Sequence, residues 1–230
     1  IKIPLPSLEV QQQIVDELTL VEESTTTIQT RLDQLKREKE QYRKYGKKAE
    51  IRALLEGSES KMLGDVCEIN GGTRIVKKEC LSGIYPVYGS GKPTFNTNNS
   101  NRSGKNIIVG RFALSEKCVR IIEGDIYLND SGLSVHNDNP VTFQYIGYYL
   151  LFNQSVIYNL SRGQAQRNLN MNKFKELKIP LPSLEIQEQC ITLFEQKEAY
   201  IESIDKKIAE YKNYLEELKA FAKDVITSFC

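Results

Sequence analysis

Two polar loops in the middle of the chain carry side chains suited to hydrogen bonding with nucleic-acid bases. Residues 95–106 read FNTNNSNRSGKN, and residues 161–170 read SRGQAQRNLN. Arg, Gln and Asn form paired hydrogen bonds with the edges of guanine and adenine, whereas Lys, Ser and backbone amides suit phosphate. Asn, Gly and Ser are also common in ordinary turns, and for either loop alone that explanation is the better one. The occurrence of both loops in one basic region favours binding.

The charge of the chain is unevenly distributed. The formal net charge is +1, yet residues 58–177 hold 14 Lys and Arg against 10 Asp and Glu. Residues 36–52 hold 8 basic side chains and 3 acidic ones. A charge run on a helix is more often a solvated face than a binding surface. Taken with the polar loops, however, this distribution indicates a polyanionic partner.

The residues that most enzymes need are missing. His136 is the only histidine, so neither a histidine metal cluster nor a histidine-based catalytic triad can form. The GSGKP turn at 89–93 lacks the first Gly and the final Ser or Thr of a phosphate-binding P-loop. The five cysteines form no C-x-x-C pair, which favours reduced thiols in a cytoplasmic protein. We therefore expect no metal and no cofactor in this chain, and no catalysis by the chain itself.

Membrane insertion and secretion are not expected either. No apolar run reaches the roughly 18 residues that span a bilayer, and no basic-then-apolar leader is present. The chain begins at Ile1 rather than Met, which suggests a trimmed or partial product.

An internal repeat indicates the elements that must position the two loops. Residues 2–15 read KIPLPSLEVQQQIV and residues 178–191 read KIPLPSLEIQEQCI, with 10 of 14 positions identical. Each copy breaks at Pro-x-Pro and leads into a long helix, with Ser7 or Ser183 at the N-cap position and Glu9 or Glu185 in the first turn. We expect helices from about residue 8 to 45 and from about 184 to 227. Residues 1–6 match the segment that leaves the middle domain in the second copy, so they resemble the last strand of a second domain of the same kind.

Both helices show apolar residues at heptad spacing, which predicts an antiparallel coiled coil with the middle domain at one tip. Thr25 and Lys39 interrupt the first seam, where we expect it to loosen. The alternative is two helices packed separately on a globular core, which would need wider apolar faces. The predicted seam consists of Leu18, Val21, Ile28, Leu32, Leu35, Ile201, Ile204, Ile208, Tyr211, Leu215 and Leu218.

The middle of the chain predicts a compact α+β domain. Short strand signals (KMLGDVCEI, YPVY, NIIVG, VRII and DIYL) are separated by Gly, Asn and Ser clusters. TFQYIGYYLLFNQSVIYNL reads as a largely buried helix and MNKFKEL as a short one. The predicted organisation is the end of a preceding domain strand with the first spacer helix (1–56), the middle domain (57–183) and the second helix (184–230).

These strings together resemble a known family. SRGQAQRNLNMNKFKELKIPLPSLEIQEQ is similar to the end of a target-recognition domain and the start of a spacer helix in the specificity subunit of type I restriction–modification systems. YPVYGSGKPTFNTNNSN, followed by NIIVGR, resembles the body of such a domain. Family members usually carry two recognition domains and two spacers, so this chain departs from the pattern with one domain and two spacers.

The resemblance implies a subunit that reads double-stranded DNA and does no chemistry itself. It implies methyltransferase (modification) subunits as partners, with an endonuclease or translocase subunit as a further one, and S-adenosylmethionine as a cofactor of the methyltransferase only. A homodimer would read a two-fold symmetric split site, and a piece of a longer chain would read half of an asymmetric one. The resemblance also implies a set of DNA-facing residues. Three of them, in GGTRIVKK, are candidates for phosphate contacts: Arg74, Lys77 and Lys78. The others are Lys92, Arg102, Lys105, Arg111, Arg162, Gln164, Gln166, Arg167 and Asn168.

An interpretation from another class stays open. A helical scaffold whose middle domain binds a protein would share the repeat and the seam. It would predict salt-insensitive binding and a middle domain without a basic surface. Its binding would not change on alanine substitution at Gln164, Gln166 and Arg167.

Overall fold

The computed structural model describes residues 6–77, 83–163 and 167–228. The chain divides into a helical unit, residues 1–50 with 193–230, and a globular unit, residues 51–192. In chain order the elements are α1 (Leu8–Tyr45), α2 (Lys48–Leu54), β1 (Ser60–Met62), α3 (Leu63–Val66), β2 (Glu68–Gly71), β3 (Tyr85–Tyr88), β4 (Asn96–Thr97), β5 (Lys105–Gly110), β6 (Val119–Glu123), β7 (Tyr127–Leu128), β8 (Gly132–His136), α4 (Pro140–Phe152), α5 (Gln154–Asn159), β9 (Ser161–Arg162), β10 (Asn168–Leu169), α6 (Met171–Lys175), β11 (Lys178–Pro180) and α7 (Leu184–Ser228). The α+β class with two long helices is as predicted.

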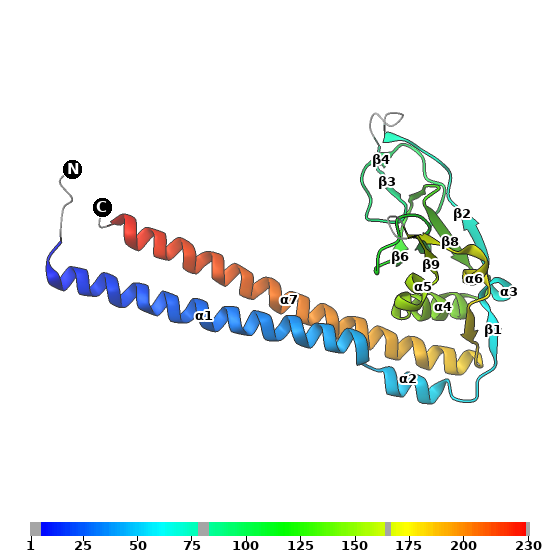
Figure 1. Cartoon of the computed structure of the whole chain (residues 1–230), viewed down its shortest axis with the longest axis horizontal. Coiled ribbons are helices and arrows are strands. Elements are labelled where there is room, and N and C mark those ends of the chain that lie inside the picture. Colours follow the sequence, from blue (N-terminus) through cyan, green and yellow to red (C-terminus); the bar gives the residue numbers. More distant parts are fainter. Residues whose placement is uncertain (1–5, 78–82, 164–166, 229–230) are drawn as a thin grey trace. The chain divides into compact units, whose positions relative to one another are not determined.

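The helical unit consists of α1 and most of α7, which lie side by side (Figure 1). Ser7 caps α1, because its Oγ accepts a hydrogen bond from the Val10 amide at 3.3 Å. The two helices run antiparallel. The ring centroids of Tyr42 and Tyr200 lie 4.2 Å apart, and Ile28, earlier on α1, shares a hollow with Tyr211, later on α7.

Every residue of the predicted seam is buried or half-buried in the helix pair. Polar contacts join the helices as well. Tyr200 donates from its hydroxyl to Glu38 Oε1 at 2.6 Å, and Lys39 forms an ion pair with Asp205. The charge of Lys39, which interrupts the heptad, is therefore paired with a carboxylate of the opposite helix. The supercoil expected of a heptad seam stays a prediction.

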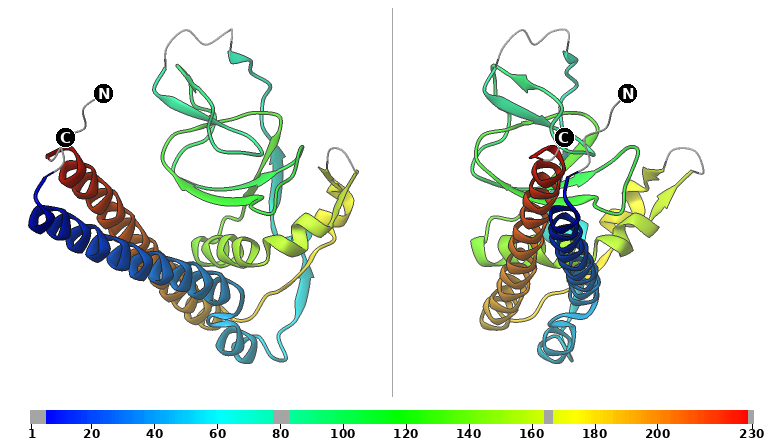
Figure 2. Two further views of the ribbon diagram at one scale, coloured as in Figure 1. Left: turned by 60° about the vertical axis from the view of Figure 1, so that its left-hand side comes forward. Right: turned by 90° about the vertical axis from the view of Figure 1, so that its left-hand side faces the viewer.

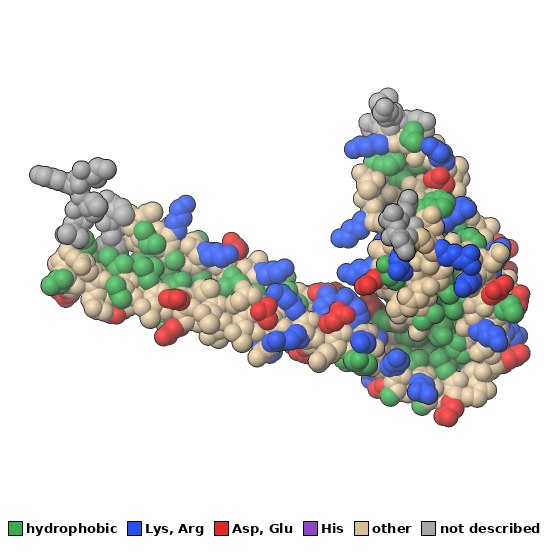
Figure 3. Space-filling model, in the orientation of Figure 1, with side chains coloured by type: hydrophobic (Ala, Val, Ile, Leu, Met, Phe, Trp, Pro, Cys, Tyr) green, Lys and Arg blue, Asp and Glu red, His purple; other side chains and the backbone are tan. Residues whose placement is uncertain are grey.

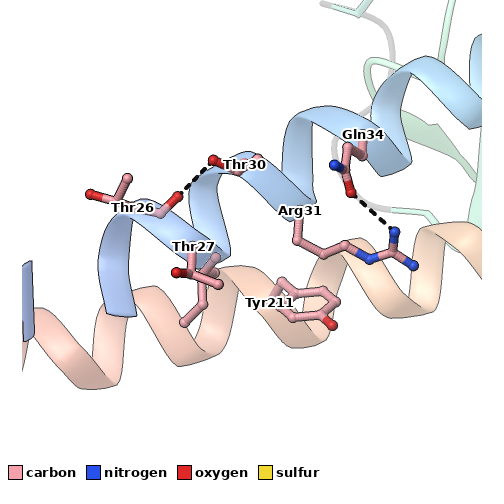
Figure 4. A pocket seen from close by; sticks show the side chains of 7 residues that line it. Thr26, Thr27, Thr30, Arg31, Gln34 and Tyr211 are labelled. Carbon is pink, nitrogen blue, oxygen red and sulfur yellow. Dashed lines mark hydrogen bonds between the residues drawn. The ribbon is translucent and has the colours of Figure 1, made fainter. Parts of the chain in front are cut away.

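A hollow of about 470 Å³ opens between the helices near Thr25, the other interruption of the seam (Figure 4). Thr30 donates from Oγ1 to the carbonyl oxygen of Thr26 at 2.9 Å, and Arg31 donates to Gln34 Oε1 at 3.2 Å. These polar groups are thus satisfied by their own helix. Short threonine side chains leave space where a larger apolar residue would fill the seam.

The globular unit is built around a four-stranded sheet in the order β2-β8-β5-β6, with antiparallel neighbours. β5 lies between β8 and β6, and its residues from Asn106 to Gly110 are all buried. Full burial of an Ile or Val side chain contributes about 1.5–3 kcal/mol. The apolar run NIIVG therefore supplies the centre of the core. A smaller sheet, β4-β3-β7, has a parallel β3–β7 pair.

Helix α4 covers the sheet and connects it to the exit strand (Figure 2). Gly147 lets the helix approach closely, because a Cβ at this position would meet Ile107 Cδ1 at 3.0 Å. Tyr145 is fully buried, and its hydroxyl donates to the carbonyl oxygen of Pro180 at 2.8 Å. β11 pairs in turn with β1, so the entry and exit of the globular unit are held together.

Three local expectations differ from the structure. KMLGDVCEI is not one strand: a helical turn, α3, separates β1 from β2, and the amide of Leu63 bonds instead to Leu177 O at 2.9 Å. The predicted long helix breaks at Asn153 into α4 and α5, where Asn153 Nδ2 bonds back to the carbonyl of Tyr149. Strand β8 was not predicted at all, although it is central to the sheet.

Candidate nucleic-acid interface

Three loops meet at one edge of the four-stranded sheet. The register pairs Gly71 with Leu133, Gly110 with Gly132, and Val109 with Val119. The end of β2, the beginning of β8, the end of β5 and the beginning of β6 therefore share this edge. The turn after β3 joins them through Ser90, whose Oγ donates to the carbonyl oxygen of Ser131 at 2.6 Å. We call this set the loop edge, and it consists of residues 72–77, 89–92, 111–118 and 129–131.

Hydrogen bonds between distant parts of the chain fix the backbone of the loop edge. Ser90 Oγ accepts from the amides of Arg111 and Phe112 at 3.2 and 3.1 Å. The Ser90 amide donates to Ser131 Oγ at 3.2 Å, and that hydroxyl donates to Asn129 Oδ1 at 2.6 Å. The turn carrying Lys92 and the loop beginning at Arg111 are thus parts of one network.

Glycine makes two close approaches at the loop edge possible. A Cβ on Gly72 would lie 2.0 Å from the carbonyl oxygen of Asn129, and one on Gly89 would lie 2.1 Å from Ser131 Oγ. Neither separation is sterically possible for another residue without movement of the backbone or of the network. The motif GGT is anchored here, since the Thr73 amide donates to Leu128 O at 2.9 Å.

The loop after β5 is also held by the β9–β10 hairpin. The Leu169 amide donates to Arg111 O at 2.9 Å, and the Leu114 amide donates to Arg167 O at 2.8 Å. Between them Ala113 adopts a left-handed φ of 48°, and its amide donates to Asn168 Oδ1 at 3.4 Å. Asn168 therefore supports a sharp turn that brings Arg111 beside the hairpin.

Two arginines of this region stack on aromatic rings. Arg111 Cζ lies 4.7 Å from the centroid of Phe112, and Arg167 Cζ lies 4.7 Å from the centroid of Tyr158. Arg167 also donates to Ser161 Oγ at 3.4 Å. Stacking restricts the rotamers of a long side chain and leaves the edge of the guanidinium available for hydrogen bonding.

Most of the predicted DNA-facing residues gather at the loop edge or on the adjoining hairpin. Arg74, Lys77 and Lys92 are exposed on the loop edge, and Arg162, Arg167 and Asn168 are exposed on the hairpin. Arg111 is half-buried between the two. Three further predicted residues, Lys78, Gln164 and Gln166, lie outside the described residues.

Arg102 and Lys105 are placed differently. Arg102 is half-buried, and its guanidinium donates to Ser134 Oγ, Asn101 O and Gly71 O at 3.1, 2.7 and 3.3 Å. Lys105 begins β5 and pairs in register with Glu123, at the end of the strand opposite to Arg111. Five residue steps of β-strand separate Lys105 from Gly110, a distance of roughly 17 Å. The DNA-facing roles predicted for these two residues stay predictions without support from their geometry.

The supporting residues were missed by sequence reasoning. Arg120 donates to Ser90 O and Lys117 O, both at 3.1 Å, and burial lowers the pKa of its guanidinium. Ser90, Asn129 and Ser131 sit in GS and NDS turns, which resemble many other turns. A signal was present only in the polar composition of these turns, because the bonds of Ser90 to Ser131 and to Arg111 join residues more than 20 positions apart in sequence.

Within the described ranges, the cations of the loop edge form no ion pair with an acidic side chain. Among the described residues, the ion pairs of the globular unit join Lys61 to Glu59 at 4.0 Å and His136 to Asp138 at 3.4 Å. Basic side chains outnumber acidic ones over the upper part of the globular unit in Figure 3. A surface with unpaired Lys and Arg attracts polyanions and gives up condensed counterions on binding.

Within the described ranges, no three His, Cys, Asp or Glu side chains come together in a way that would hold a metal ion. None of the helices in those ranges is both long enough and apolar enough to cross a membrane.

The fold and the loop edge define a class of protein in which an α+β recognition domain with a cationic loop surface is joined to a long helix pair. The family described as the type I restriction modification DNA specificity domain matches residues 56–213. The chain belongs to this family, as the resemblance of its motifs implied.

Solved structures show the same fold at low sequence identity. A type I restriction–modification S subunit from M. genitalium is 16% identical, with a TM-score of 0.51 over 97% of this chain and 61% of its own length. The HsdS subunit from Thermoanaerobacter tengcongensis is 18% identical, with a TM-score of 0.52 over 99% of this chain and 59% of that one. A chain from a structure of type I R–M complex assembly and conformational transition reaches a TM-score of 0.61 at 16% identity, over 99% of this chain and 60% of its own. This chain thus spans about three-fifths of the length of the structures that it matches.

Proposed function

We propose that this chain is a non-catalytic, sequence-specific DNA-recognition subunit of a type I restriction–modification complex, and that it directs methyltransferase and endonuclease subunits to a split target site. The observation that carries the proposal is the loop edge. Side chains from several separate segments converge there, without acidic partners among the described residues, on a backbone fixed by the Ser90 network. Fixed donors on a cationic surface suit base reading combined with phosphate attraction.

The helix pair supports a measuring role in this proposal. α1 has 38 residues, which at 1.5 Å per residue gives an axis of roughly 57 Å. That length corresponds to on the order of 15 base pairs of B-DNA. Two recognition domains separated by such a pair would read two short sequences with a constant gap between them.

The internal repeat supports a second recognition domain in the assembly. In the second copy, Ile191 is 9% exposed, whereas the matching Val15 of the first copy is 55% exposed. Four other large apolar side chains are exposed on the same end of the helical unit, namely Leu8 and Leu20 on α1 and Phe221 and Ile226 on α7. Figure 3 shows hydrophobic side chains gathered on this end. An exposed apolar patch of this kind marks an interaction surface. The occupant in this proposal is a further recognition domain, supplied either by a second copy of the chain in a homodimer or by the rest of a longer chain.

The proposed partners follow from the family. Methyltransferase subunits would bind S-adenosylmethionine and carry out the DNA methylation, and the endonuclease subunit would translocate and cut. The setting of this complex is the cytoplasm. This chain would contribute the choice of site and no catalytic group.

DNA affinity measured against salt tests the proposal. The full chain, alone and with a type I methyltransferase subunit, is titrated with labelled duplex at several salt concentrations. The logarithm of the affinity should fall linearly with the logarithm of the salt concentration. Lys92→Gln and Arg162→Gln should each lower that slope by about one, as expected for one lost phosphate contact. Lys61→Gln, whose ammonium already pairs with Glu59, is the matched control. Binding that is absent, or indifferent to salt and to these substitutions, would favour the protein-binding scaffold instead.

A further inference from the structure

We infer that Arg111 reads a guanine through the major groove, and that Ser90 is the positioning residue that holds it for this task. The inference rests on the proposed function and deepens it, because it assigns a base to one side chain. Arginine donates two hydrogen bonds to O6 and N7 of guanine, which is the commonest specific contact between a protein and a base. Such a contact requires a fixed backbone and a free guanidinium edge.

The backbone of Arg111 is fixed on both sides. Its amide donates to Ser131 O at 2.8 Å and to Ser90 Oγ at 3.2 Å, and its carbonyl accepts from Leu169 at 2.9 Å. It directly follows the fully buried end of β5. The backbone of Arg111 is therefore already ordered before DNA binds. Less conformational entropy is lost on binding, so more of the contact energy can discriminate between bases.

The side chain of Arg111 is oriented by an aromatic ring, and its side-chain N–H donors are left free within the described ranges. Its Cζ lies 4.7 Å from the ring centroid of Phe112, whose amide is held by Ser90 Oγ at 3.1 Å. Among the described residues, the Arg111 guanidinium takes part in no ion pair and no hydrogen bond. Its remaining donors are available to a ligand.

The other arginines of the site differ in ways that single out Arg111. The guanidinium groups of Arg102 and Arg120 donate hydrogen bonds to carbonyl and hydroxyl oxygens within the protein. Arg167 shares one donor with Ser161. Arg74 and Arg162 are exposed, with no aromatic ring against the guanidinium among the described residues, and exposed cations of this kind suit phosphate.

Ser90 links the two loops on which the reading geometry depends. Its hydroxyl donates to Ser131 and accepts from two consecutive amides, and its carbonyl accepts from Arg120 at 3.1 Å. Alanine at this position would keep the charge of the surface and remove the hydroxyl alone. It would remove the bond that holds the Phe112 amide and the longer of the two bonds that hold the Arg111 amide, whose bond to Ser131 O would remain. The ring of Phe112, against which the guanidinium stacks, would be held less firmly.

The test is a selection of duplexes from a random-sequence library by the full chain, alone and with a type I methyltransferase subunit. It compares the wild type with Arg111→Lys, Ser90→Ala and the control Arg52→Lys. Arg52 is exposed on α2, so its variant matches the substitution type away from the loop edge. Arg111→Lys should reduce the preference for guanine at one position by roughly tenfold or more, and change the affinity for a scrambled duplex less than about twofold. Ser90→Ala should weaken the preference at that same position, and Arg52→Lys should change nothing.

The outcomes separate this inference from the proposed function. If the wild type enriches a motif and Arg111→Lys enriches the same motif with equal strength, Arg111 does not read a base and the inference is wrong. A further variant, Arg111→Ala, is titrated with the enriched and the scrambled duplex. The inference is also wrong if this variant lowers the affinity equally for both, because that is the behaviour of a phosphate contact. If the wild type enriches no sequence, the proposed function fails as well. Thermal melting of each variant shows whether a lost preference comes from loss of the fold.

Discussion

Gln11 and Gln187 stand at equivalent positions of the internal repeat and form the same hydrogen bond. Each donates from Nε2 to the carbonyl oxygen of the proline five residues earlier, Pro6 or Pro182, at 2.8 Å. Gln187 is only 3% exposed, and its Oε1 is buried without a partner among the described residues. Gln11 is half-buried. The two helix starts are therefore built alike, but only the second is covered by the described part of the chain.

This relationship gives a matched pair of substitutions. Ile191→Asp should lower the free energy of unfolding by about 3 kcal/mol or more, because it buries a carboxylate. Val15→Asp, at the equivalent position of the first copy, should change the unfolding free energy of the monomer by less than about 0.5 kcal/mol. Urea unfolding followed by circular dichroism measures both.

Solution mass decides what covers Val15. If a further recognition domain of a second copy does so, Val15→Asp should shift the assembly from dimer to monomer while the fold is retained. A wild-type chain that is monomeric at all concentrations would rule out the homodimer and leave the longer chain. A dimer that Val15→Asp does not disturb would show that the apolar patch around Val15 is not the interface.

The neighbouring glycines of GGT should differ strongly in how much stability alanine removes. A Cβ on Gly72 would meet the backbone oxygen of Asn129 at 2.0 Å, whereas one on Gly71 meets nothing within 4 Å. Gly72→Ala should therefore lower stability by about 1–3 kcal/mol, and Gly71→Ala by much less. Chemical denaturation midpoints check the difference. Equal midpoints for the two variants would mean that the β2 end is not held against the 129–131 turn as described.

Arg102 should prove to be a structural residue. Its substitution by Gln removes three hydrogen bonds inside the globular unit, and we expect a loss of about 1–3 kcal/mol in stability. Lys105→Gln, three residues later and exposed, should change stability by less than about 0.5 kcal/mol. Calorimetry of both variants measures this. Unchanged stability in Arg102→Gln together with weaker DNA binding would instead assign Arg102 to the DNA contact that its sequence context suggested.

The thiols of buried Cys118 and half-buried Cys67 should resist alkylation. Burial raises the pKa of Cys118 to about 11 and that of Cys67 to about 12, so at pH 8 roughly one Cys118 in a thousand or fewer is a thiolate. Iodoacetamide should label both cysteines far more slowly in the folded protein than in urea, as read by peptide mass spectrometry.

The same shifts give a pH dependence of stability. The folded chain holds these protons more tightly than the unfolded chain, whose thiols titrate near pH 8.5. The contribution to stability is therefore complete below about pH 8.5 and falls as the pH rises toward 11. Labelling of Cys67 and Cys118 as fast in the native protein as in urea would contradict the burial on which both expectations depend.

The long helices could be predicted because their signals are local. The cap at Ser7, the seam through Leu32 and Leu35 and the stop at Gly46 all lie within the segment that they define. Strand β8 was missed because GLSVH is short and mixed, although Leu133 and Val135 alternate with Ser134 and His136 as a half-buried strand requires. Period-two alternation over so few residues is easily overlooked.

The candidate site could be predicted only in part, because its geometry depends on pairing across the chain. The residue types of both polar loops pointed to bases and phosphates, and the hairpin with Arg162, Arg167 and Asn168 does lie beside Arg111. The use of Arg102 inside the domain, and the position of Lys105 at the far end of β5, follow from which strands are neighbours. A local pattern does not encode that choice.

Selection of duplexes by the assembled complex shows whether this chain reads a split DNA site. The full chain with its methyltransferase subunits is mixed with random-sequence DNA, and the retained duplexes are sequenced. We predict a motif of two short specified parts separated by a gap of constant length, on the order of one and a half helical turns of DNA. Retention of DNA without any enriched sequence, or no retention at low salt, would contradict it.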